Sequence, residues 1–530
     1  MDTQTIQRRR WVILGVLVVG LLAIVIDNTV LNVALKTIAS PVAGLGASQS
    51  QLEWAINSYT LVFAGMLFTF GVIGDRIGRK RMLMIGLVLF GLGSLLSAYS
   101  HSPGELIAAR AAMGLGGAAV MPQTLSIISN VFEPQERARA IGIWASAVGI
   151  GVAIGPVLGG LLLAHFWWGS VFLINVPVTV LGAAAVLALV PESRNPAPGK
   201  IDYLGVLGSI VGLVLLVYGI VQGGDGASWT SAGVLGPALG GLLVLGLFAW
   251  YESRIDHPSL DIRLFRDRRL SASVGAISLL FFGFGGVYFF TSFYMQNVRG
   301  YTPLDAGLLT VPFALGQFIA APRSASLVTR YGARAVGVGG MLLNAVAIAG
   351  YATLGTGSPI WILAVLFGIQ GAGVGVAMPA ATAAVMDVLP RERAGAGSAL
   401  TNTARQVAVA LGVAVLGSIL AQSYRSTLSP TLAKLPAGAR GPAGQSITAT
   451  QAVAEQLGHA GRFLLDPANV AFVDAMRITT LIAAGIAVLG GLVVMRWMPG
   501  RPRPTIEEQV AAEVAAAELE LAANRELSDR

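Results

Sequence analysis

The chain has 530 residues, of which 55% are hydrophobic and 12% are charged, whereas soluble domains carry roughly 25% charged residues. This composition excludes a water-soluble fold. The net charge is +8, but the basic residues lie in short clusters between apolar segments, which argues against the continuous basic face of a nucleic-acid-binding protein. Cysteine is absent, which excludes a disulfide framework, a thiolate metal site and a cysteine nucleophile.

Apolar segments of about 20 residues recur along the chain, and a helix of that length crosses roughly 30 Å of hydrocarbon. We therefore predict an all-α polytopic membrane protein with fourteen transmembrane helices. In chain order, the predicted spans are 11–34, 53–73, 82–100, 105–128, 139–163, 170–190, 203–222, 232–251, 271–296, 304–327, 334–354, 359–385, 397–421 and 476–497. Because fourteen is an even number, both termini are expected on the same side of the membrane.

Lysine and arginine are distributed unequally between the two sides. Three arginines precede the first span and every second loop after it is basic, whereas the intervening short loops carry only Lys36 and Arg299. Cytoplasmic loops of membrane proteins carry such an excess of positive charge. The distribution therefore predicts that both termini are cytoplasmic.

Two long segments lie outside the predicted spans. Residues 422–473 join the last two spans outside the cell and are rich in Pro, Gly, Ser and Thr, which predicts a surface loop with a short helix at 452–457. The C-terminal tail begins with Thr505 and Glu508 in a capping-box pattern and continues as an acidic, alanine-rich helix. This tail is either a solvated cytoplasmic helix or a regulatory, partner-binding segment.

Asp27 and Arg110 need an explanation, because a charge at the bilayer centre costs from about 2.5 kcal/mol upward. Asp27 lies about 24 Å along the first span from Trp11, and Arg110 lies about 7 Å from the outer end of the antiparallel fourth span. The two charges are therefore predicted at similar depth. Either they form a pair in which Arg110 keeps Asp27 ionised until a proton or a cationic substrate competes for it, or Arg110 reaches the headgroups and Asp27 caps a helix end.

Other polar residues are scattered along the spans. Asn28 and Asn32 are four positions apart and form a polar stripe beside Asp27. Further polar positions within the spans are Asn57, Gln317, Gln370, Asn402, Arg405 and Gln406. Such side chains either line a substrate cavity or hold helices together through hydrogen bonds. Glu53 and Asp305 lie near predicted outer interfaces, where contact with solvent explains them.

The fifth span carries small residues at a spacing of four. Gly151, Gly155 and Gly159 lie on one helix face, and Pro156 lies beside them. Small residues let helix backbones approach closely, and proline removes a backbone hydrogen bond and favours a kink. This face is either a static packing seam or a seam that slides during gating.

The loop after the second span has the sequence GVIGDRIGRKRM. We predict that it is a cytoplasmic gating loop, formed by Gly71, Asp75, Arg76, Gly78, Arg79, Lys80 and Arg81. A loop that only orients the chain would need the positive charges, but it would not need an acid and glycines at set positions. Asp75 is predicted to accept hydrogen bonds from a neighbouring helix end or from Arg79.

A later loop, LVTRYGARAV, repeats this pattern in degenerate form. Arg330, Gly332 and Arg334 match Arg76, Gly78 and Lys80. Threonine stands at the position of the acid. The repeat is what a duplication of a six-helix half would leave in the sequence.

At these residues the chain closely resembles the fourteen-helix drug:proton antiporter branch of the major facilitator superfamily, the EmrB/QacA type. The segment from Gly71 to Arg81 is similar to that family's loop signature G-x-x-x-D-R-x-G-R-[KR]-[KR], and IDNTVLNVAL around Asp27 resembles its first-helix motif. RAAMGLGGAAV from Arg110 resembles the fourth-helix motif, and GPVLGG from Gly155 resembles the fifth-helix antiporter motif. The resemblance covers nearly the whole chain.

The resemblance implies that Asp27 and Arg110 couple transport to protons, with the proton gradient as the energy source and no bound cofactor. Met113 stands where the family often has glutamine, which alters the hydrogen bonding expected around Arg110. In the fifth helix the family's motif marks export. The residues that belong to it here are Gly151, Gly155, Pro156, Gly159 and Gly160.

The resemblance also implies two six-helix bundles that rock about a substrate site at the midplane. The expected domains are an N-terminal bundle at 1–190, an inserted helix pair with its linkers at 191–270, a C-terminal bundle at 271–497 that includes the loop 422–473, and a cytoplasmic acidic helical tail at 498–530. We expect a monomer in a bacterial inner membrane. Its expected partners are the lipid bilayer, protons and small amphipathic or hydrophobic compounds such as drugs, antibiotics or dyes.

Other functions fit the sequence less well. A proton-coupled importer is disfavoured by the fifth-helix motif, while a metabolite exporter of narrow specificity stays open. A membrane enzyme is disfavoured because the four histidines lie outside the predicted spans without metal-ligand spacing, and because no G-x-x-x-x-G-K-[ST] phosphate loop is present. A channel is disfavoured because the predicted spans contain no ring of charges that could select ions.

Overall fold

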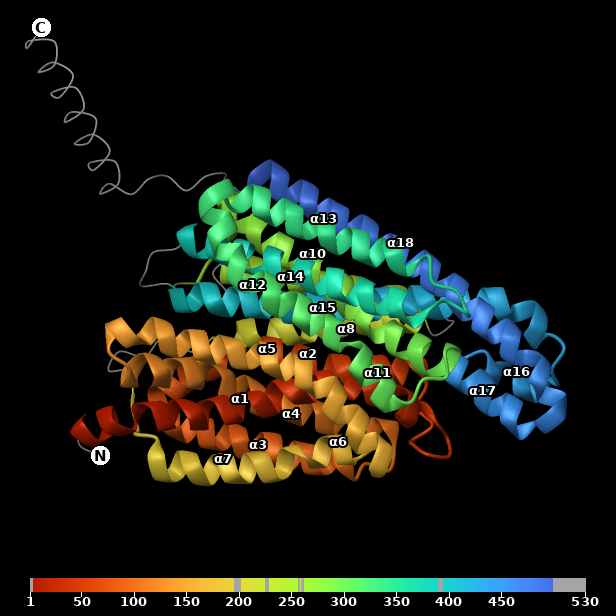
Figure 1. Cartoon of the computed structure of the whole chain (residues 1–530), viewed down its shortest axis with the longest axis horizontal. Coiled ribbons are helices and arrows are strands. Elements are labelled where there is room, and N and C mark those ends of the chain that lie inside the picture. The colour runs from red at the N-terminus through yellow and green to blue at the C-terminus, as the bar shows by residue number, and fades with distance from the viewer. Residues whose placement is uncertain are drawn as a thin grey trace, which may run out of the picture.

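The structure, a computed structural model, describes residues 3–194, 202–224, 228–255, 258, 262–388 and 394–498. Its helices form two bundles that lie side by side along the long axis of the molecule (Figure 1). The N-terminal helices make up one bundle and the C-terminal helices make up the other. The predicted tail lies outside the described residues from residue 499 onward, and so does its capping-box pattern at Thr505 and Glu508.

The N-terminal bundle consists of α1 (Thr3–Ala39), α2 (Gln49–Ile77), α3 (Arg79–Ala98), α4 (Pro103–Val131), α5 (Pro134–His165), α6 (Ser170–Leu173) and α7 (Asn175–Leu189). The sequence supplies caps where two of these helices begin. Ser48 forms a capping box with Gln51 at α2, and the Ser102 side chain accepts a hydrogen bond from the Glu105 backbone at α4. The predicted sixth span corresponds to α6 and α7 together.

The C-terminal bundle consists of α10 (Arg268–Phe293), the π-helical turn η2 (Tyr294–Val298), α11 (Pro303–Leu309), α12 (Val311–Tyr331), α13 (Ala333–Tyr351), α14 (Ile360–Val388), α15 (Ala394–Leu432) and α18 (Leu465–Trp497). A short 3-10 helix, η1 (Ile262–Arg266), precedes it. Asp305 is exposed and forms a capping box with Thr302 at the start of α11. Glu53, by contrast, is only 2% exposed on α2, so contact with solvent does not explain it.

Twelve helices in the described part of the chain are long and apolar enough to cross a membrane. A thirteenth is added if the two parts of α2, which are bent by 53° relative to each other, form one span. α5 is 32 residues long, and its apolar part is the shorter helix Ile150–His165. The all-α, multi-pass class is therefore confirmed, while the number of fourteen spans stays a prediction.

The inserted pair consists of α8 (Tyr203–Gly224) and α9 (Ala232–Glu252). α8 packs against α2 of one bundle and α15 of the other. A small apolar cluster joins these three helices and includes Leu61, Val217 and Ala410. The bundles also meet directly where α2 packs on α15, α5 on α11, and α1 on α10.

The segment 422–473 is largely helical, so the prediction of a surface loop was wrong. α15 continues to Leu432, and α16 (Ala437–Ala443), α17 (Ile447–Gln456) and the 3-10 helix η4 (Gly458–Leu464) lead directly into α18. The predicted short helix at 452–457 overlaps the end of α17. Packing explains the difference: Tyr424 forms a hydrogen bond of 2.6 Å with Thr450 and an edge contact with Phe472. Figure 1 places α16 and α17 at the opposite end of the molecule from the N-terminus.

The two repeated loops share one backbone feature. Gly78 joins α2 to α3 with φ of 118°, and Gly332 joins α12 to α13 with φ of 86°. Residues other than glycine rarely adopt such positive φ angles. The turn between the two helices therefore requires glycine in both halves. The repeat that the sequence indicates is therefore also present in the local structure.

Candidate functional site: a buried ion pair beside a cavity between the bundles

Asp27, within α1, contacts Arg110 on α4. Arg110 Nη1 donates a hydrogen bond to Asp27 Oδ2 at 2.5 Å, and both side chains are 1% exposed. Arg110 Nε donates to the backbone oxygen of Ala55 on α2 at 3.1 Å, and its Nη1 lies 3.7 Å from Met113 Sδ. The predicted contact is therefore present, and the alternative in which Arg110 reaches the headgroups is wrong. The role of the pair in proton coupling stays a prediction.

Asn175 and Tyr59 complete the surroundings of this pair, and neither was predicted from the sequence. Asn175 Nδ2 donates to Asp27 Oδ1 at 3.0 Å and also reaches Ser94 Oγ at 3.3 Å. The guanidinium of Arg110 lies over the Tyr59 ring, 4.4 Å from its centroid. Asn175 could have been identified as an amide in an otherwise apolar span. Tyr59 gave no such signal, because a tyrosine in a membrane helix is ordinary.

A cavity of about 180 Å³ lies between the two bundles, and residues of α1, α2, α4, α5, α10 and α15 line it. Asn28, the neighbour of Asp27, is among them. Asn28 Nδ2 donates to the hydroxyl of Tyr59 at 3.1 Å, and Tyr59 in turn lies against Arg110. A continuous series of contacts therefore connects the buried ion pair to the cavity.

The predicted cavity residues divide into two groups. Four of them line the cavity: Asn28, Asn32, Arg405 and Gln406. Three do not: Asn57, Gln317 and Gln370. Asn57 is fully buried in α2, and Gln370 accepts a hydrogen bond from Tyr351 at 2.8 Å inside the C-terminal bundle. Asn57 lies on α2 outside its cavity-lining positions, while Gln317 on α12 and Gln370 on α14 lie on helices that contribute no lining residue. The sequence alone could not say which helices border the cavity.

Aromatic residues of α10 form one wall of the cavity, and they were not among the predicted cavity residues. Phe281, Phe284 and Tyr288 line it. The rings of Phe284 and Tyr288 are stacked, with centroids 5.4 Å apart and an interplanar angle of 16°. The guanidinium of Arg405 lies 5.6 Å from the centroid of Phe281. The spacing of three and four residues along α10 was the signal that could have identified this wall.

Hydrogen bonds join α1 to the end of α10 and to η2 across the bundle interface. Lys36 Nζ donates to the backbone oxygen of Gln296 at 2.6 Å, and Gln296 Nε2 donates to the backbone oxygen of Val33 at 2.9 Å. Ser292 Oγ donates to the backbone oxygen of Asn32 at 2.5 Å. These bonds hold the two bundles together at the end that the sequence predicts to be extracellular.

The fifth-helix glycines form a close packing seam. Gly151, Gly155 and Gly159 face α1, where a side chain at Gly155 would collide with Thr29 and one at Gly151 would lie 2.8 Å from Val25. Close helix approach is therefore confirmed.

The other face of α5 meets the opposite bundle. A Cβ atom at Gly160 would lie 2.5 Å from the Cα atom of Leu304 on α11, and Pro156 is in contact with Gly307. α5 thus contacts α1 within its own bundle and α11 across the interface. A gating motion along this seam stays a prediction.

The predicted gating loop is held by charged side chains. Asp75 accepts a hydrogen bond from Arg79 Nε at 2.8 Å, as predicted. Glu192, after α7, accepts from the backbone N of Lys80 at 3.1 Å and lies 3.7 Å from Arg81 Nε. A carboxylate at the start of α3 is favoured by the helix dipole. Glu192 was missed because it lies far from the loop in sequence.

Comparison with known proteins decides the family. Residues 17–413 match the sequence profile of the Major Facilitator Superfamily. The chain belongs to this superfamily. Membership identifies it as a multi-pass membrane transporter for small molecules and not as an enzyme.

Relatives within the superfamily align over most of the transporter. The methyl viologen resistance protein SmvA of Salmonella typhimurium is 34% identical over 475 residues, which are 88% of this chain and 93% of that protein. The multidrug efflux pump LfrA of Mycolicibacterium smegmatis is 36% identical over 493 residues, which are 92% of this chain and 96% of that protein. The fold is also similar to a solved structure of a bacterial homolog of the human lysosomal transporter Spinster, in an inward-facing and unoccupied conformation. The TM-score is 0.66 over 94% of this chain and 99% of that chain. The sequences are 18% identical, so the similarity shows the fold alone.

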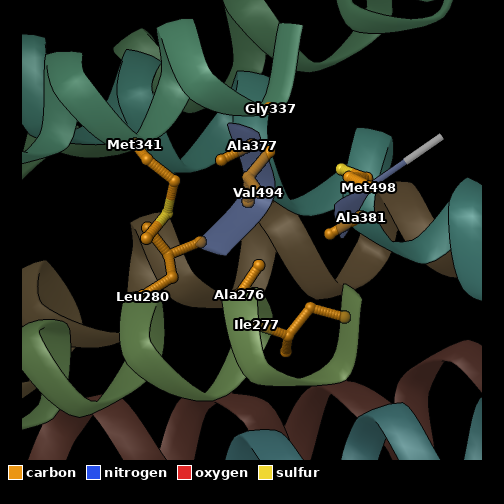
Figure 2. Close-up of a pocket in the computed structure, with 9 residues that line it drawn as sticks. All are labelled: Ala276, Ile277, Leu280, Gly337, Met341, Ala377, Ala381, Val494 and Met498. Carbon is orange, nitrogen blue, oxygen red and sulfur yellow. The ribbon is translucent and has the colours of Figure 1, made fainter. Parts of the chain in front are cut away.

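A second pocket of this superfamily member lies inside the C-terminal bundle. Figure 2 shows its nine lining residues, which come from α10, α13, α14 and α18 and include Met498 directly after α18. All of them are apolar, and Leu280 and Met341 are the largest side chains that face each other there. Because a ligand site needs at least a few polar groups to orient a ligand, we interpret this pocket as a gap in the packing of the bundle.

Proposed function

We propose that the protein is a proton-coupled antiporter that exports small amphipathic or hydrophobic compounds by alternating access. The observation that carries this proposal is the buried pair of Asp27 and Arg110 beside the cavity between the bundles. Ionisable groups inside the membrane typically mark ion or substrate pathways, and a carboxylate is the group that can take up a proton there. The names of the relatives, a resistance protein and a multidrug efflux pump, support export.

The remaining features of the proposal follow from the sequence. The protein is assigned to the fourteen-helix EmrB/QacA branch, with α2 and α5 as spans in addition to the twelve that meet the length and hydropathy test. It functions as a monomer in the bacterial cell membrane with both termini cytoplasmic. The bias of arginine and lysine toward alternate loops supports this orientation.

In the proposed cycle, Asp27 alternates between an ionised and a protonated state. While it is ionised, Arg110 and Asn175 bind its two carboxylate oxygens. Protonation removes the negative charge, so Arg110 loses its counter-charge in a medium where an unpaired charge is costly. Because Arg110 also lies over Tyr59, which accepts a hydrogen bond from Asn28 in the cavity wall, its displacement alters the cavity.

Access to the outside requires the bundles to separate at the predicted extracellular end. The bonds from Lys36, Ser292 and Gln296 join the bundles there and must break when the cavity opens outward. Glycine contacts of α5 with both α1 and α11 give a narrow seam along which one bundle can move against the other. The proton gradient supplies the energy for this cycle.

The test uses inside-out membrane vesicles with an acid interior. We expect wild-type protein to accumulate one or more members of a panel of amphipathic dyes and antibiotics, with cationic, neutral and anionic members, in a gradient-dependent way. Asp27→Asn should abolish this accumulation because the asparagine cannot take up a proton. The matched control is Asp474→Asn, since Asp474 is an acid with a 43% exposed side chain on α18. Equal accumulation by wild type and Asp27→Asn would contradict the coupling role.

A further inference from the structure

The cavity between the bundles contains one charged side chain among its described lining residues, and that side chain is Arg405. No aspartate or glutamate lines it in the part of the chain that the structure describes. Asp27 lies on the same helix as Asn28 but is 1% exposed and bound by Arg110 and Asn175, so it does not supply a counter-charge in the cavity. The charge that a ligand meets there is therefore positive.

Arg405 retains donors for a ligand. A guanidinium carries five N–H donors, and here Nη2 donates one hydrogen bond, to Asn402 Oδ1 at 2.9 Å. Among the described residues it forms no ion pair with a carboxylate. Arg405 lies within the membrane-length segment Leu400–Leu432, where an uncompensated charge is costly. An anionic ligand would supply the missing counter-charge, and its carboxylate could bind two N–H groups of the guanidinium at once.

The rest of the cavity is suited to a flat, apolar ring. The stacked rings of Phe284 and Tyr288 lie beside Phe281. The guanidinium of Arg405 lies over the face of the Phe281 ring. Aromatic ligands gain from stacking on such surfaces. On the opposite side Ile24 and Val25 of α1 give an aliphatic wall. A planar aromatic group and an anionic group can thus be bound next to each other.

We propose that the preferred substrates are aromatic organic anions and that Arg405 is the residue that selects them. This inference rests on the proposed export function, because it takes the cavity as the substrate site. A cation of the same size would place its charge next to Arg405 without a carboxylate to offset the repulsion. The amides of Asn28 and Gln406 can serve as neutral hydrogen-bonding partners for either kind of ligand.

Three fluorescent probes of nearly equal shape test the role of charge: naphthoate, naphthalenemethanol and naphthylmethylammonium, which are anionic, neutral and cationic. Binding to purified protein in detergent is measured by the change in probe fluorescence. We expect wild-type protein to bind naphthoate most tightly and the ammonium most weakly. Arg405→Gln should weaken naphthoate binding by about tenfold or more, while Arg405→Lys, which keeps the charge, should retain most of it.

The outcomes separate this inference from the proposed function. The proposal that Arg405 selects anions is wrong if wild-type protein binds the ammonium probe as tightly as naphthoate. It is also wrong if Arg405→Gln binds naphthoate as tightly as wild type. Should Arg405→Gln fail to fold, the order of affinities of wild-type protein for the three probes decides the question. Gradient-dependent accumulation of cations alone in the vesicle assay would leave export intact and overturn only this inference. Tight naphthoate binding without any proton-dependent accumulation would instead contradict the proposed antiport.

Discussion

The N-terminal bundle buries a charged pair, Asp27 and Arg110, whereas the pocket inside the C-terminal bundle is lined by apolar side chains only (Figure 2). The two bundles nevertheless share the glycine-based loop that a duplication would leave, at Gly78 and Gly332. The backbone of the turn is thus the same in both halves, while among the described residues the buried ion pair lies in the N-terminal half. The two halves therefore have different tasks in the transport cycle that we propose.

The repeated loops differ in the same way. In the first loop Asp75 pairs with Arg79, and in the second the corresponding residue is Thr329, whose hydroxyl donates to the backbone oxygen of Ser326 at 2.8 Å. Arg334 donates to the backbone oxygen of Met498 at 2.8 Å. The second loop is thus held by hydrogen bonds to backbone atoms where the first uses an ion pair between side chains. Among the described residues, the first loop is the one held by a carboxylate, so it can respond directly to a change in carboxylate charge.

The largest effect is expected from removing one partner of the buried pair. Arg110→Ala leaves the Asp27 carboxylate buried without a counter-charge, which should lower the free energy of unfolding by about 3–5 kcal/mol and abolish transport. The double variant Asp27→Asn/Arg110→Gln should regain stability but not proton-coupled transport. Stability is measured by unfolding in mixed detergent micelles.

The control for this prediction is Arg477→Ala in α18 of the C-terminal bundle. Arg477 and Asp474 form a pair whose side chains are 50% and 43% exposed, so its removal should cost about 0–1 kcal/mol. Equal losses for Arg110→Ala and Arg477→Ala would mean that burial of the charged pair does not distinguish the two bundles.

An intermediate effect is expected at the fifth-helix seam. Gly155→Leu places a side chain where Thr29 of α1 lies, and overpacking of this kind costs about 1–3 kcal/mol. The matched substitution in the other bundle is Gly275→Leu on α10, where no heavy atom lies within 4 Å of an added Cβ. Gly155→Leu should have a lower free energy of unfolding in detergent and a lower transport rate in vesicles than Gly275→Leu. If Gly275→Leu is as damaging as Gly155→Leu, the close contact of Gly155 with α1 does not explain the damage.

The smallest effect is expected in the apolar pocket of Figure 2. Ile277→Val removes one methylene group there and should cost about 0.5–1.5 kcal/mol without changing the KM for transport. Ile24→Val makes the same change in the wall of the cavity between the bundles and should alter the KM as well. A KM change of similar size in both variants would show that the pocket inside the C-terminal bundle takes part in substrate binding.

Depth along the membrane was predictable for the candidate site, but the direction of each side chain was not. The similar depth of Asp27 and Arg110 followed from counting residues along two antiparallel helices at 1.5 Å per residue, and the structure confirms their contact. Asn28 and Asn57 looked equivalent in the sequence, yet Asn28 lines the cavity and Asn57 is buried elsewhere. The rotation of a helix about its axis is set by the helices packed against it, and local sequence does not contain that information.

The all-α membrane architecture was predictable from the apolar segments, because backbone polar groups in hydrocarbon must be satisfied within each segment. The sequence also predicted that Gly151, Gly155 and Gly159 share one helix face, because they are four residues apart. The hydrogen bond from Asn175 to Asp27, 148 positions away in the chain, and the helices within 422–473 became visible in the folded structure. Both depend on contacts between segments far apart in sequence, and such contacts form only once the bundles are packed.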